Sequence, residues 1–477
     1  MNKVEAMYVD GRFQLPQGQA HSDLFNPATG ACIGQVRLGD AQDADLAVAA
    51  AARAWPEFAG TTVAQRIEGL RSLHQAVSDQ VEAIAEATVL EYGAPLARAR
   101  GMAQAGAHMF LDAAAVLQDY AFTRRMGTAQ VSMEPLGVAA LITPWNGNAM
   151  FVCAKLASAL AAGCTAVVKP SELSALQTQA LLQALHGAGL PAGVINVVNG
   201  RGDEVGAALC AHPQVAKVSF TGSTAVGRSI LCAAAPSFKR VTLELGGKSP
   251  TVILDDADLG QAVALALAAG FSNSGQACSA GTRILVPRAR LDDFLALLKP
   301  AVQATPVGDP RDPATVVGPL VSQTQWQRVQ RYIRRGLDEG ARVLVGGEGR
   351  PDGLPAALQA GYFVKPTVFV EVDNAMTIAR EEIFGPVLSV IAYEDEADAV
   401  RIANDTDYGL QAYVVSGGDG ARARRVASRL RAGVVSINGL HHEPMAPFGG
   451  FKHSGLGREL GPFGLEAFLE PKTTLGG

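Results

Sequence analysis

Several features that would assign the chain to a particular class of protein are missing from its sequence. The six cysteines form no Cys-X-X-Cys pair and have no histidine at zinc-ligand spacing, so we expect no metal site. Four of them lie in segments rich in Ala, Val and Leu, where a buried free thiol packs as a small apolar side chain: Cys153, Cys164, Cys210 and Cys232. This pattern favours a reducing compartment.

The sequence also has no long apolar run and no excess of basic charge. The apolar segment 262–271 is far too short to cross a bilayer, and the N-terminus lacks the apolar core of a signal peptide. The net charge is −5, from 40 basic and 45 acidic residues that are interspersed. We therefore expect a cytoplasmic protein that binds neither nucleic acid nor membrane and whose partner is a small molecule.

The length and the spacing of apolar residues predict an α/β protein. A chain of 477 residues exceeds one ordinary core, so two or more domains are expected. Residues 41–120 have the period of amphipathic helices, and 120–133 fits a hairpin or an edge segment. Short β-branched runs then alternate with helical stretches, which is typical of βαβ units around parallel sheets. We expect strands at 138–143, 165–169, 194–198, 216–220, 251–254, 283–286, 341–345, 367–371, 387–393 and 433–438.

Polar groups follow several of these strands, where parallel sheets bind their ligands. Lys169 and Glu172 suit the hydroxyls of a ribose, or equally a solvated turn. The amide of Asn146 suits an oxyanion, or a turn. Gly222 and Ser223 stand at a helix start, which suits a phosphate but also an ordinary N-cap.

A thiol and a carboxylate complete the set of reactive groups. Cys278 lies in a turn-rich stretch of small residues, an open loop in which a thiol is a potential nucleophile. Glu244 is flanked by leucines and followed by two glycines, so we expect a half-buried carboxylate with a raised pKa, suited to a general base. Together they suggest the formation and hydrolysis of an acyl-thiol.

These motifs occur in one order along the chain, and in that order they resemble the NAD(P)-dependent aldehyde dehydrogenase superfamily over essentially the whole length. The resemblance is carried by residues 144–146, 169–172, 220–223, 243–248, 275–278, 381–386 and 447–452. It implies a Rossmann-like cofactor domain (1–115 with 135–246), an α/β catalytic domain (247–446) and a small oligomerisation element (116–134 with 460–477). The protein would then be a homodimer or a homotetramer.

The resemblance implies a role for each reactive group. Cys278 would attack the aldehyde carbon, and the Asn146 amide and the Cys278 backbone N–H would bind the oxyanion. Glu244 would activate the water that releases the acid. Relatives that pass the acyl group to coenzyme A lack an acid at this position, so hydrolysis is favoured. Lys155 and Glu459 match family positions for which we expect supporting roles.

The cofactor residues are implied in the same way. Adenosine ribose would be bound by Lys169 and Glu172, the pyrophosphate by Gly222 and Ser223, and the nicotinamide half by Glu382 and Phe384, with Trp145 in the adjoining wall. A carboxylate at Glu172 would repel a 2′-phosphate, so we expect NAD to be preferred, with NADP possible.

Departures from the family pattern bear on the substrate. Gly147 stands where the family has an aromatic residue and Ala154 where many relatives have tryptophan, so the aldehyde tunnel should be wider and less aromatic. This disfavours a betaine aldehyde, because a quaternary ammonium group binds aromatic faces. The predicted pocket residues are Gly147, Phe151, Ala154, Ala277, Ser279, His441 and His442. The two histidines either bond a polar or anionic substrate tail or are simply exposed.

Other functions stay open on the sequence alone. The enzyme could be a specialist for a semialdehyde or an aromatic aldehyde. A thiol hydrolase without redox chemistry would need no NAD, but it leaves Lys169, Glu172 and Glu382 unexplained. A catalytically idle structural relative is disfavoured because Cys278 and Glu244 are both intact.

Overall fold

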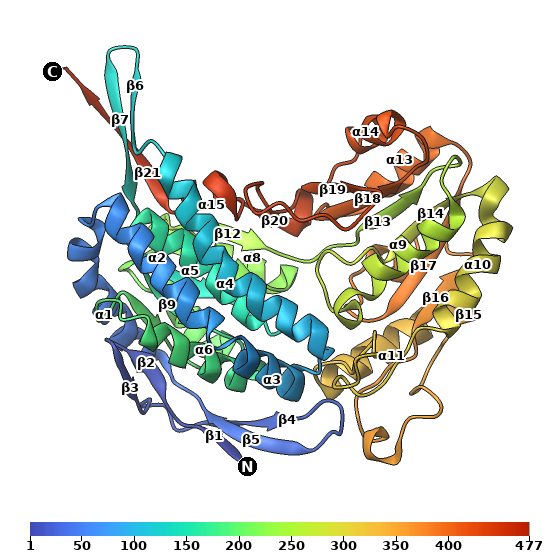
Figure 1. Ribbon diagram of the computed structural model, residues 1–477, viewed down its shortest axis with the longest axis horizontal. Coiled ribbons are helices and arrows are strands. Elements are labelled where there is room, and N and C mark those ends of the chain that lie inside the picture. The colour runs from blue at the N-terminus through green and yellow to red at the C-terminus, as the bar shows by residue number, and fades with distance from the viewer. Residues whose placement is uncertain (477) are drawn as a thin grey trace.

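Two large sheets organise the structure, a computed structural model that describes residues 1–476 (Figure 1). The first sheet has the strand order β20-β12-β11-β8-β9-β10-β2-β3. Its central strands are parallel to one another: β8 (Val138–Ile142), β9 (Thr165–Lys169), β10 (Ile195–Val197), β11 (Val215–Thr221) and β12 (Arg240–Glu244). The outer strands are antiparallel to their neighbours: β2 (Met7–Val9), β3 (Arg12–Gln14) and β20 (Gly455–Leu456).

Helices cover both faces of the first sheet because its buried strands present apolar side chains alternately to the two sides. Ala139 and Leu141 of β8 pack on one side, and Val138, Ala140 and Ile142 pack on the other. The first side is covered by α2 (Val63–Ser78), α4 (Leu96–Asp119), α5 (Asn148–Ala162) and α6 (Ala175–Gly187). The second side is covered by α1 (Ala41–Ala59), α7 (Ala207–Ala211) and α8 (Thr224–Ala234).

Local signals set the bounds of the N-terminal helices. Asp40 and Thr62 form capping boxes with the residues three positions later, and these start α1 and α2. Gly93 adopts a left-handed conformation that ends α3 (Val81–Tyr92). The predicted helical character of residues 41–120 is therefore confirmed.

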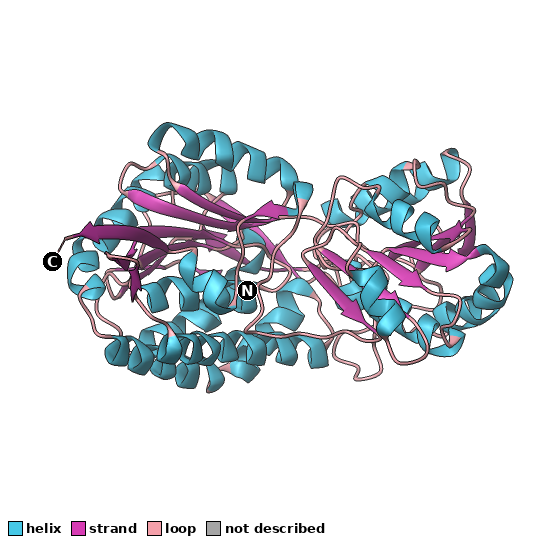
Figure 2. Ribbon diagram, turned by 90° about the horizontal axis from the view of Figure 1, so that it is seen from above, coloured by secondary structure: helices cyan, strands magenta, loops and turns pink. Residues whose placement is uncertain are grey.

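The second sheet has the order β15-β16-β17-β14-β13-β18-β19 and is parallel except at β15. Its strands are β13 (Pro250–Ile253), β14 (Arg283–Pro287), β15 (Arg342–Val345), β16 (Thr367–Val370), β17 (Val387–Tyr393), β18 (Gln411–Val415) and β19 (Val434–Ile437). One face packs on α9 (Leu259–Phe271) and α10 (Leu291–Gln303). The other packs on α11 (Gln323–Asp338), α12 (Thr377–Arg380), α13 (Glu396–Asn404) and α14 (Ala421–Ala427). Figure 2 shows both sheets between their helices.

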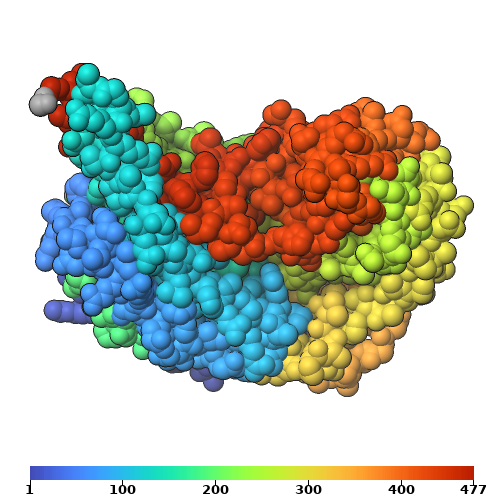
Figure 3. Space-filling model, turned by 45° about the horizontal axis from the view of Figure 1, so that its top comes forward, coloured from blue at the N-terminus to red at the C-terminus, as the bar shows by residue number. Residues whose placement is uncertain are grey.

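Two three-stranded sheets complete the fold. The first joins β1 (Asn2–Val4), β5 (Cys32–Arg37) and β4 (His21–Phe25). The second joins β21 (Leu469–Leu475), β7 (Ala129–Pro135) and β6 (Thr123–Met126), and it projects from the body (Figure 1). After β19 the chain returns to the first sheet, where β20 pairs with β12 and α15 (Gly461–Glu466) packs on α4 and α5. This C-terminal part lies across the boundary between the two halves (Figure 3, red).

The structure confirms the predicted α/β class and the ten predicted strands to within two residues at each end. It adds β12, β18, β20, β21 and the short strands β1 to β5, which were not predicted. One cysteine was predicted wrongly. Cys153, Cys164 and Cys210 are buried, but Cys232 is exposed, because it lies on the outward side of α8 beside the partly exposed Leu231. Within residues 1–476, every helix is too short or too polar to cross a membrane.

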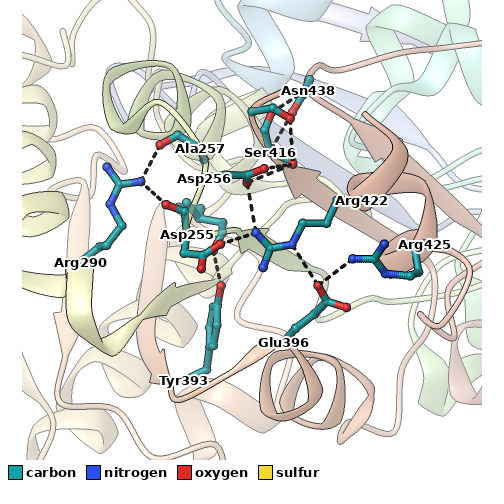
Figure 4. Close-up of polar contacts among 12 residues, drawn as sticks. Asp255, Asp256, Ala257, Arg290, Tyr393, Glu396, Ser416, Arg422, Arg425 and Asn438 are labelled. Atoms are coloured by element: carbon teal, nitrogen blue, oxygen red, sulfur yellow. Dashed lines mark hydrogen bonds and ion pairs between the residues drawn. The ribbon is translucent and has the colours of Figure 1, made fainter. Parts of the chain in front are cut away.

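From β8 in the first sheet and from β13 in the second, the chain adds parallel strands on one side and then crosses to the other side. The crossover falls between β8 and β11 in the first sheet and between β13 and β18 in the second. Ligands of parallel sheets bind at the carboxyl ends of the strands beside such a crossover. In the second sheet that place is filled by Arg422, which pairs with Asp255, Asp256 and Glu396 (Figure 4). The crossover of the first sheet is therefore the better place for a ligand.

Candidate active site

A cleft of about 230 Å³ opens at the crossover of the first sheet. Its walls come from the ends of β8, β11 and β12, from α11, and from loops of the part of the chain that contains the second sheet. The lining residues are Pro144, Trp145, Asn146, Phe151, Thr221, Gly222, Ser223, Glu244, Leu245, Gly246, Cys278, Gln325, Arg328, Glu382 and Phe384. The fold thus brings together the three predicted catalytic residues and five of the seven predicted cofactor residues.

The segment before Cys278 is packed and strained, which corrects the expectation of an open loop. Asn273, Ser274 and Gly275 have φ values of 54°, 58° and 72°, in the left-handed region. Non-glycine residues there cost about 1–3 kcal/mol each and persist only where their surroundings hold them. The Ser274 hydroxyl accepts from the N–H of Gly318 at 2.9 Å, and the Gln276 side chain accepts from the N–H of Val321 at 3.0 Å. These bonds fix the approach of the chain to the thiol.

The thiol of Cys278 is a weak acid in this setting. Burial raises its pKa to about 12, and the nearby carboxylates of Glu382 and Glu244 add to the effect. The residue itself stays partly exposed, in the cleft that it lines. At neutral pH the sulfur is therefore protonated, and it must lose its proton to act as a nucleophile.

Asn146 holds a side-chain amide at the end of β8, beside the thiol loop. Its Nδ2 donates to the main-chain carbonyl of Gln276 at 2.9 Å, and the main-chain carbonyl of Asn146 accepts from Asn273 Nδ2 at 2.9 Å. Because an amide nitrogen has two hydrogens, one remains for a ligand in the cleft. This fixed donor is suited to a developing oxyanion.

Glu244 ends β12 with a carboxylate that has no hydrogen-bond partner among residues 1–476. The residue is 3% exposed, and both of its oxygens are buried without a bond. Burial raises its pKa well above the usual range, and the charge of Glu459 raises it further. A side chain at Gly449 would lie 2.6 Å from Glu244 Oε1, so the glycine leaves room for the carboxylate. An unpartnered carboxylate with a raised pKa is suited to general-base catalysis.

Lys155 and Glu459 form an ion pair near Glu244. The ammonium of Lys155 also donates to the Ser219 hydroxyl at 3.0 Å, and that hydroxyl lies 3.0 Å from Glu459 Oε1. Their charges act on Glu244 in opposite directions, because Glu459 raises its pKa and Lys155 lowers it. The two residues for which we expected supporting roles therefore influence the same carboxylate.

The far side of the cleft is suited to a dinucleotide. Ser223 caps α8, with the N–H of Val226 donating to its hydroxyl at 3.4 Å, so the positive end of the helix dipole faces the cleft. The hydroxyl of Thr221 is buried there without a partner. Trp145 and Phe384 form a perpendicular aromatic pair 5.4 Å apart, which gives flat apolar walls. These features fit the phosphates and rings of NAD.

The carboxylate of Glu382 lies in the same cleft. It accepts from the N–H of Gly247 at 3.0 Å, and burial raises its pKa to about 7. A Cβ at Gly246 would lie 2.5 Å from the carboxylate, so any larger residue there would displace the Glu382 side chain.

Two residues that the sequence analysis missed hold the segment of Glu382. Gln325 donates to the Phe384 carbonyl at 2.8 Å, and Arg328 donates to the Glu382 carbonyl at 2.7 Å. Both line the cleft from α11. Their spacing of three residues on an amphipathic helix was a weak signal, since it also fits a solvated face.

Lys169 and Glu172 lie outside the lining of the cleft, at the end of the neighbouring strand β9. The ammonium of Lys169 is 3.4 Å from Glu172 Oε2, and burial lowers the pKa of the lysine. About a third of the Glu172 side chain is exposed. A ligand that runs past Ser223 along the strand ends would reach this pair.

The predicted substrate residues lie in different places. Phe151 lines the cleft, whereas Ala154 lines a separate narrow crevice between α4 and α5. The remaining residues line neither space: Gly147, Ala277, Ser279, His441 and His442. The ring of His441 lies 3.1 Å from the Ile437 carbonyl of its own loop.

The chain matches known proteins over its whole length. Residues 14–474 match the model of the aldehyde dehydrogenase family. A 3-succinoylsemialdehyde-pyridine dehydrogenase from a Pseudomonas species is 47% identical over 100% of this chain and 99% of its own. A cysteine-to-alanine mutant of aldehyde dehydrogenase C from Pseudomonas syringae, solved with NAD+ and octanal, is 46% identical with a TM-score of 0.96, covering 99% of this chain and 96% of that one. Betaine aldehyde dehydrogenase from Staphylococcus aureus, solved with NAD+, is 36% identical with a TM-score of 0.95, covering 98% and 94%.

Gly275→Ala tests whether the strained segment positions the thiol. The new Cβ would lie 2.3 Å from the backbone of Gly385 at a positive φ, so the segment must move. We expect kcat/KM to fall by about 10²-fold, the usual cost of misplacing a reacting group by 1 Å. Gly101→Ala is the control, because its Cβ would point into open space on α4. Unchanged steady-state activity in Gly275→Ala would show that the strain has no part in catalysis.

Proposed function

Because the chain belongs to the aldehyde dehydrogenase family, we propose that it oxidises an aldehyde to its carboxylic acid with NAD, through an acyl group carried by Cys278. One observation carries this proposal: a single cleft contains a thiol, a fixed amide donor and an unpartnered carboxylate. The relatives that were solved with NAD+ support the choice of cofactor.

The first step is the attack of the Cys278 sulfur on the aldehyde carbon. The S–C bond forms, the carbonyl electron pair moves to oxygen, and the thiol proton leaves. Glu244 is suited to take that proton when it is ionised, because its charge acts on the thiol. The oxyanion then accepts from Asn146 Nδ2 and from the Cys278 N–H. Such fixed donors are worth about 2.7–4 kcal/mol each in comparable sites.

NAD, when bound, supplies the acceptor for the hydride that leaves the thiohemiacetal carbon, and a thioester on Cys278 remains. The residues of this chain that would bind NAD are Ser223 at the phosphates, Glu382 at the nicotinamide ribose, and Lys169 with Glu172 at the adenosine ribose. Trp145 and Phe384 would exclude water from its rings.

The last step is hydrolysis of the thioester. Glu244, once it has passed the thiol proton to solvent, takes a proton from water. The water oxygen bonds to the acyl carbon, the C–S bond breaks to release the acid, and the thiolate of Cys278 regains a proton from Glu244. A raised pKa makes Glu244 a stronger base, but it is ionised only in a fraction of molecules at low pH. Deacylation should therefore accelerate as the pH rises through the pKa of Glu244.

The substrate is proposed to be an aldehyde with an uncharged tail. Similar proteins are named for a pyridine semialdehyde and were solved with octanal, and both molecules have tails of this kind. Phe151 gives the thiol cleft, of about 230 Å³, an apolar wall for such a tail. A semialdehyde or aromatic-aldehyde specialist is compatible with the same space.

The proposal includes a homo-oligomer, a dimer or a tetramer, in the cytoplasm. It is supported by the projecting sheet of β6, β7 and β21, in which β6 is exposed along its length. An exposed strand edge is a template for pairing with a second chain. We propose that residues 1–115 with 135–246 form the cofactor domain and 247–446 the catalytic domain.

The catalytic assignments predict distinct kinetics for two variants. Cys278→Ala should form no NADH from any aldehyde, because no thiohemiacetal can form. Glu244→Gln should give a burst of about one NADH per site and then slow turnover, because acylation outruns hydrolysis. Stopped-flow absorbance of NADH measures both. Cys232→Ala, which removes an exposed thiol, is the control and should match the wild type. Appreciable steady-state NADH from Cys278→Ala would refute the mechanism.

The cofactor assignment predicts that Glu172 sets the preference for NAD. Glu172→Gln removes the charge that would repel a 2′-phosphate while keeping the shape of the side chain. We expect kcat/KM for NADP to rise about tenfold or more relative to NAD. Glu204→Gln, at an exposed carboxylate in the segment after β10, is the control. An unchanged ratio in Glu172→Gln would mean that Glu172 does not face the adenosine ribose.

A further inference from the structure

The backbone that carries the thiol forms a tight turn. The N–H of Ala280 donates to the carbonyl of Ala277 at 3.1 Å, so Cys278 and Ser279 are the two central residues of a β-turn. The carbonyl of Ala280 accepts in its turn from the N–H of Thr282 at 2.9 Å. These local bonds leave the carbonyl of Ser279 to be bonded by a group from elsewhere in the protein.

Tyr413 of β18 supplies that bond. Its hydroxyl donates to the main-chain carbonyl of Ser279 at 3.0 Å. In the part of the chain that the structure describes, this is the one side-chain hydrogen bond to the backbone of residues 277–281. Tyr413 is buried, and burial raises its pKa to about 12, so the hydroxyl keeps its proton at neutral pH and stays a donor. A single side chain of the second sheet thus anchors the turn.

Close packing on both sides of the turn adds to this anchor. Tyr413 is paired with Thr251 of the neighbouring strand β13. A Cβ at Gly281 would lie 2.5 Å from Thr251 Oγ1 and 3.2 Å from Tyr413 Cδ2, so the backbone after the turn lies directly against both residues. On the other side, a Cβ at Gly247 would lie 2.4 Å from the carbonyl oxygen of Cys278. Both peptide groups that follow the thiol are therefore held in place.

The turn also carries the N–H groups that lie beside the sulfur. Burial raises the pKa of the thiol, and the N–H groups of Ser279 and Cys278 partly offset this rise, because a hydrogen bond to the anionic sulfur favours it. The N–H of Cys278 is also the proposed second donor to the oxyanion. Since both N–H groups belong to the turn, a shift of the turn would move them away from the sulfur and the oxyanion.

We propose that Tyr413 is a positioning residue for the nucleophile: its hydroxyl fixes the turn of residues 277–280, so that the sulfur of Cys278 and the N–H groups beside it meet the aldehyde in one orientation. The proposal rests on the proposed function, since it takes Cys278 as the nucleophile. The lining of the thiol cleft does not include Tyr413, so the residue acts through the turn and not by contact with the substrate. Loss of the hydroxyl should slow the formation of the acyl-thiol and leave NAD binding unchanged.

Tyr413→Phe tests the proposal, because it removes the hydroxyl and keeps the ring. At saturating NAD we expect kcat/KM for octanal to fall about tenfold, the rate equivalent of one ordinary hydrogen bond. KM for NAD should stay within about twofold of the wild-type value, since binding of the cofactor does not use the turn. Alkylation of Cys278 by iodoacetamide at neutral pH, followed by mass spectrometry of its peptide without NAD or aldehyde, should slow about threefold or more because less thiolate is present.

Tyr393→Phe is the matched control, because it removes the same kind of bond elsewhere in the second sheet. The hydroxyl of Tyr393, a buried residue of β17, donates to the main-chain carbonyl of Ile253 at 2.7 Å. Both variants should lose a similar amount of thermal stability. Tyr393→Phe should nevertheless keep the wild-type kcat/KM for octanal and the wild-type rate of alkylation, because its bond lies outside the turn.

The two measurements separate this inference from the proposed function. If the wild type formed no NADH from octanal, the proposed function would be wrong, and the alkylation rates alone would still test Tyr413. A wild-type value of kcat/KM or of the alkylation rate in Tyr413→Phe would overturn the assignment of Tyr413. An equal loss in Tyr393→Phe would overturn it as well, because general loosening of the sheet would then explain the effect.

Discussion

The crossover of the chain in the first parallel sheet is the constraint on which the site depends. β8 and β11 are adjacent parallel strands, but the connections that follow them lead to opposite sides of the pair, to β9 and to β12. The carboxyl ends of β8 and β11 therefore leave a gap that these connections do not fill. Asn146 follows β8, Ser223 follows β11 and Glu244 ends β12, so all three reach the same cleft. The corresponding gap in the second sheet is filled by the ion pairs of Arg422. One half of the molecule can therefore bind the cofactor, and the other half supplies the thiol loop.

Burial raises the pKa values of the reactive groups. The carboxylate of Glu244 has no hydrogen bond, and the thiol of Cys278 is held among carboxylates, so the pKa values of both are raised. In a folded protein such groups cost stability, and they are retained where chemistry needs them. The left-handed residues 273–275 also cost stability. Their strain places the thiol beside Asn146, whose amide is bonded to the carbonyl of Gln276.

The sequence was sufficient for the class of fold, and it named several residues that the structure brings together in one cleft. Strands such as β8 and β9 are continuous apolar runs, and the motifs at their ends are local signals. The sequence was less informative about positions whose exposure or place in the cleft depends on long-range packing. Gln325 and Arg328 reach the cleft only because α11 packs beside residues 382–384. The exposure of Cys232 and the packing of the thiol loop depend on tertiary contacts that no local pattern records. The chemical roles of all the site residues stay predictions, those of Ala154, His441 and His442 included.

The central claim is that Cys278 carries the acyl group of the substrate. The most direct measurement is peptide mass spectrometry of Glu244→Gln, quenched with acid within the first turnover on octanal and NAD. The account predicts one octanoyl group per site on the peptide that contains Cys278, and none when NAD is omitted. An octanoyl group on any other residue, or none on Cys278 while NADH forms, would contradict it.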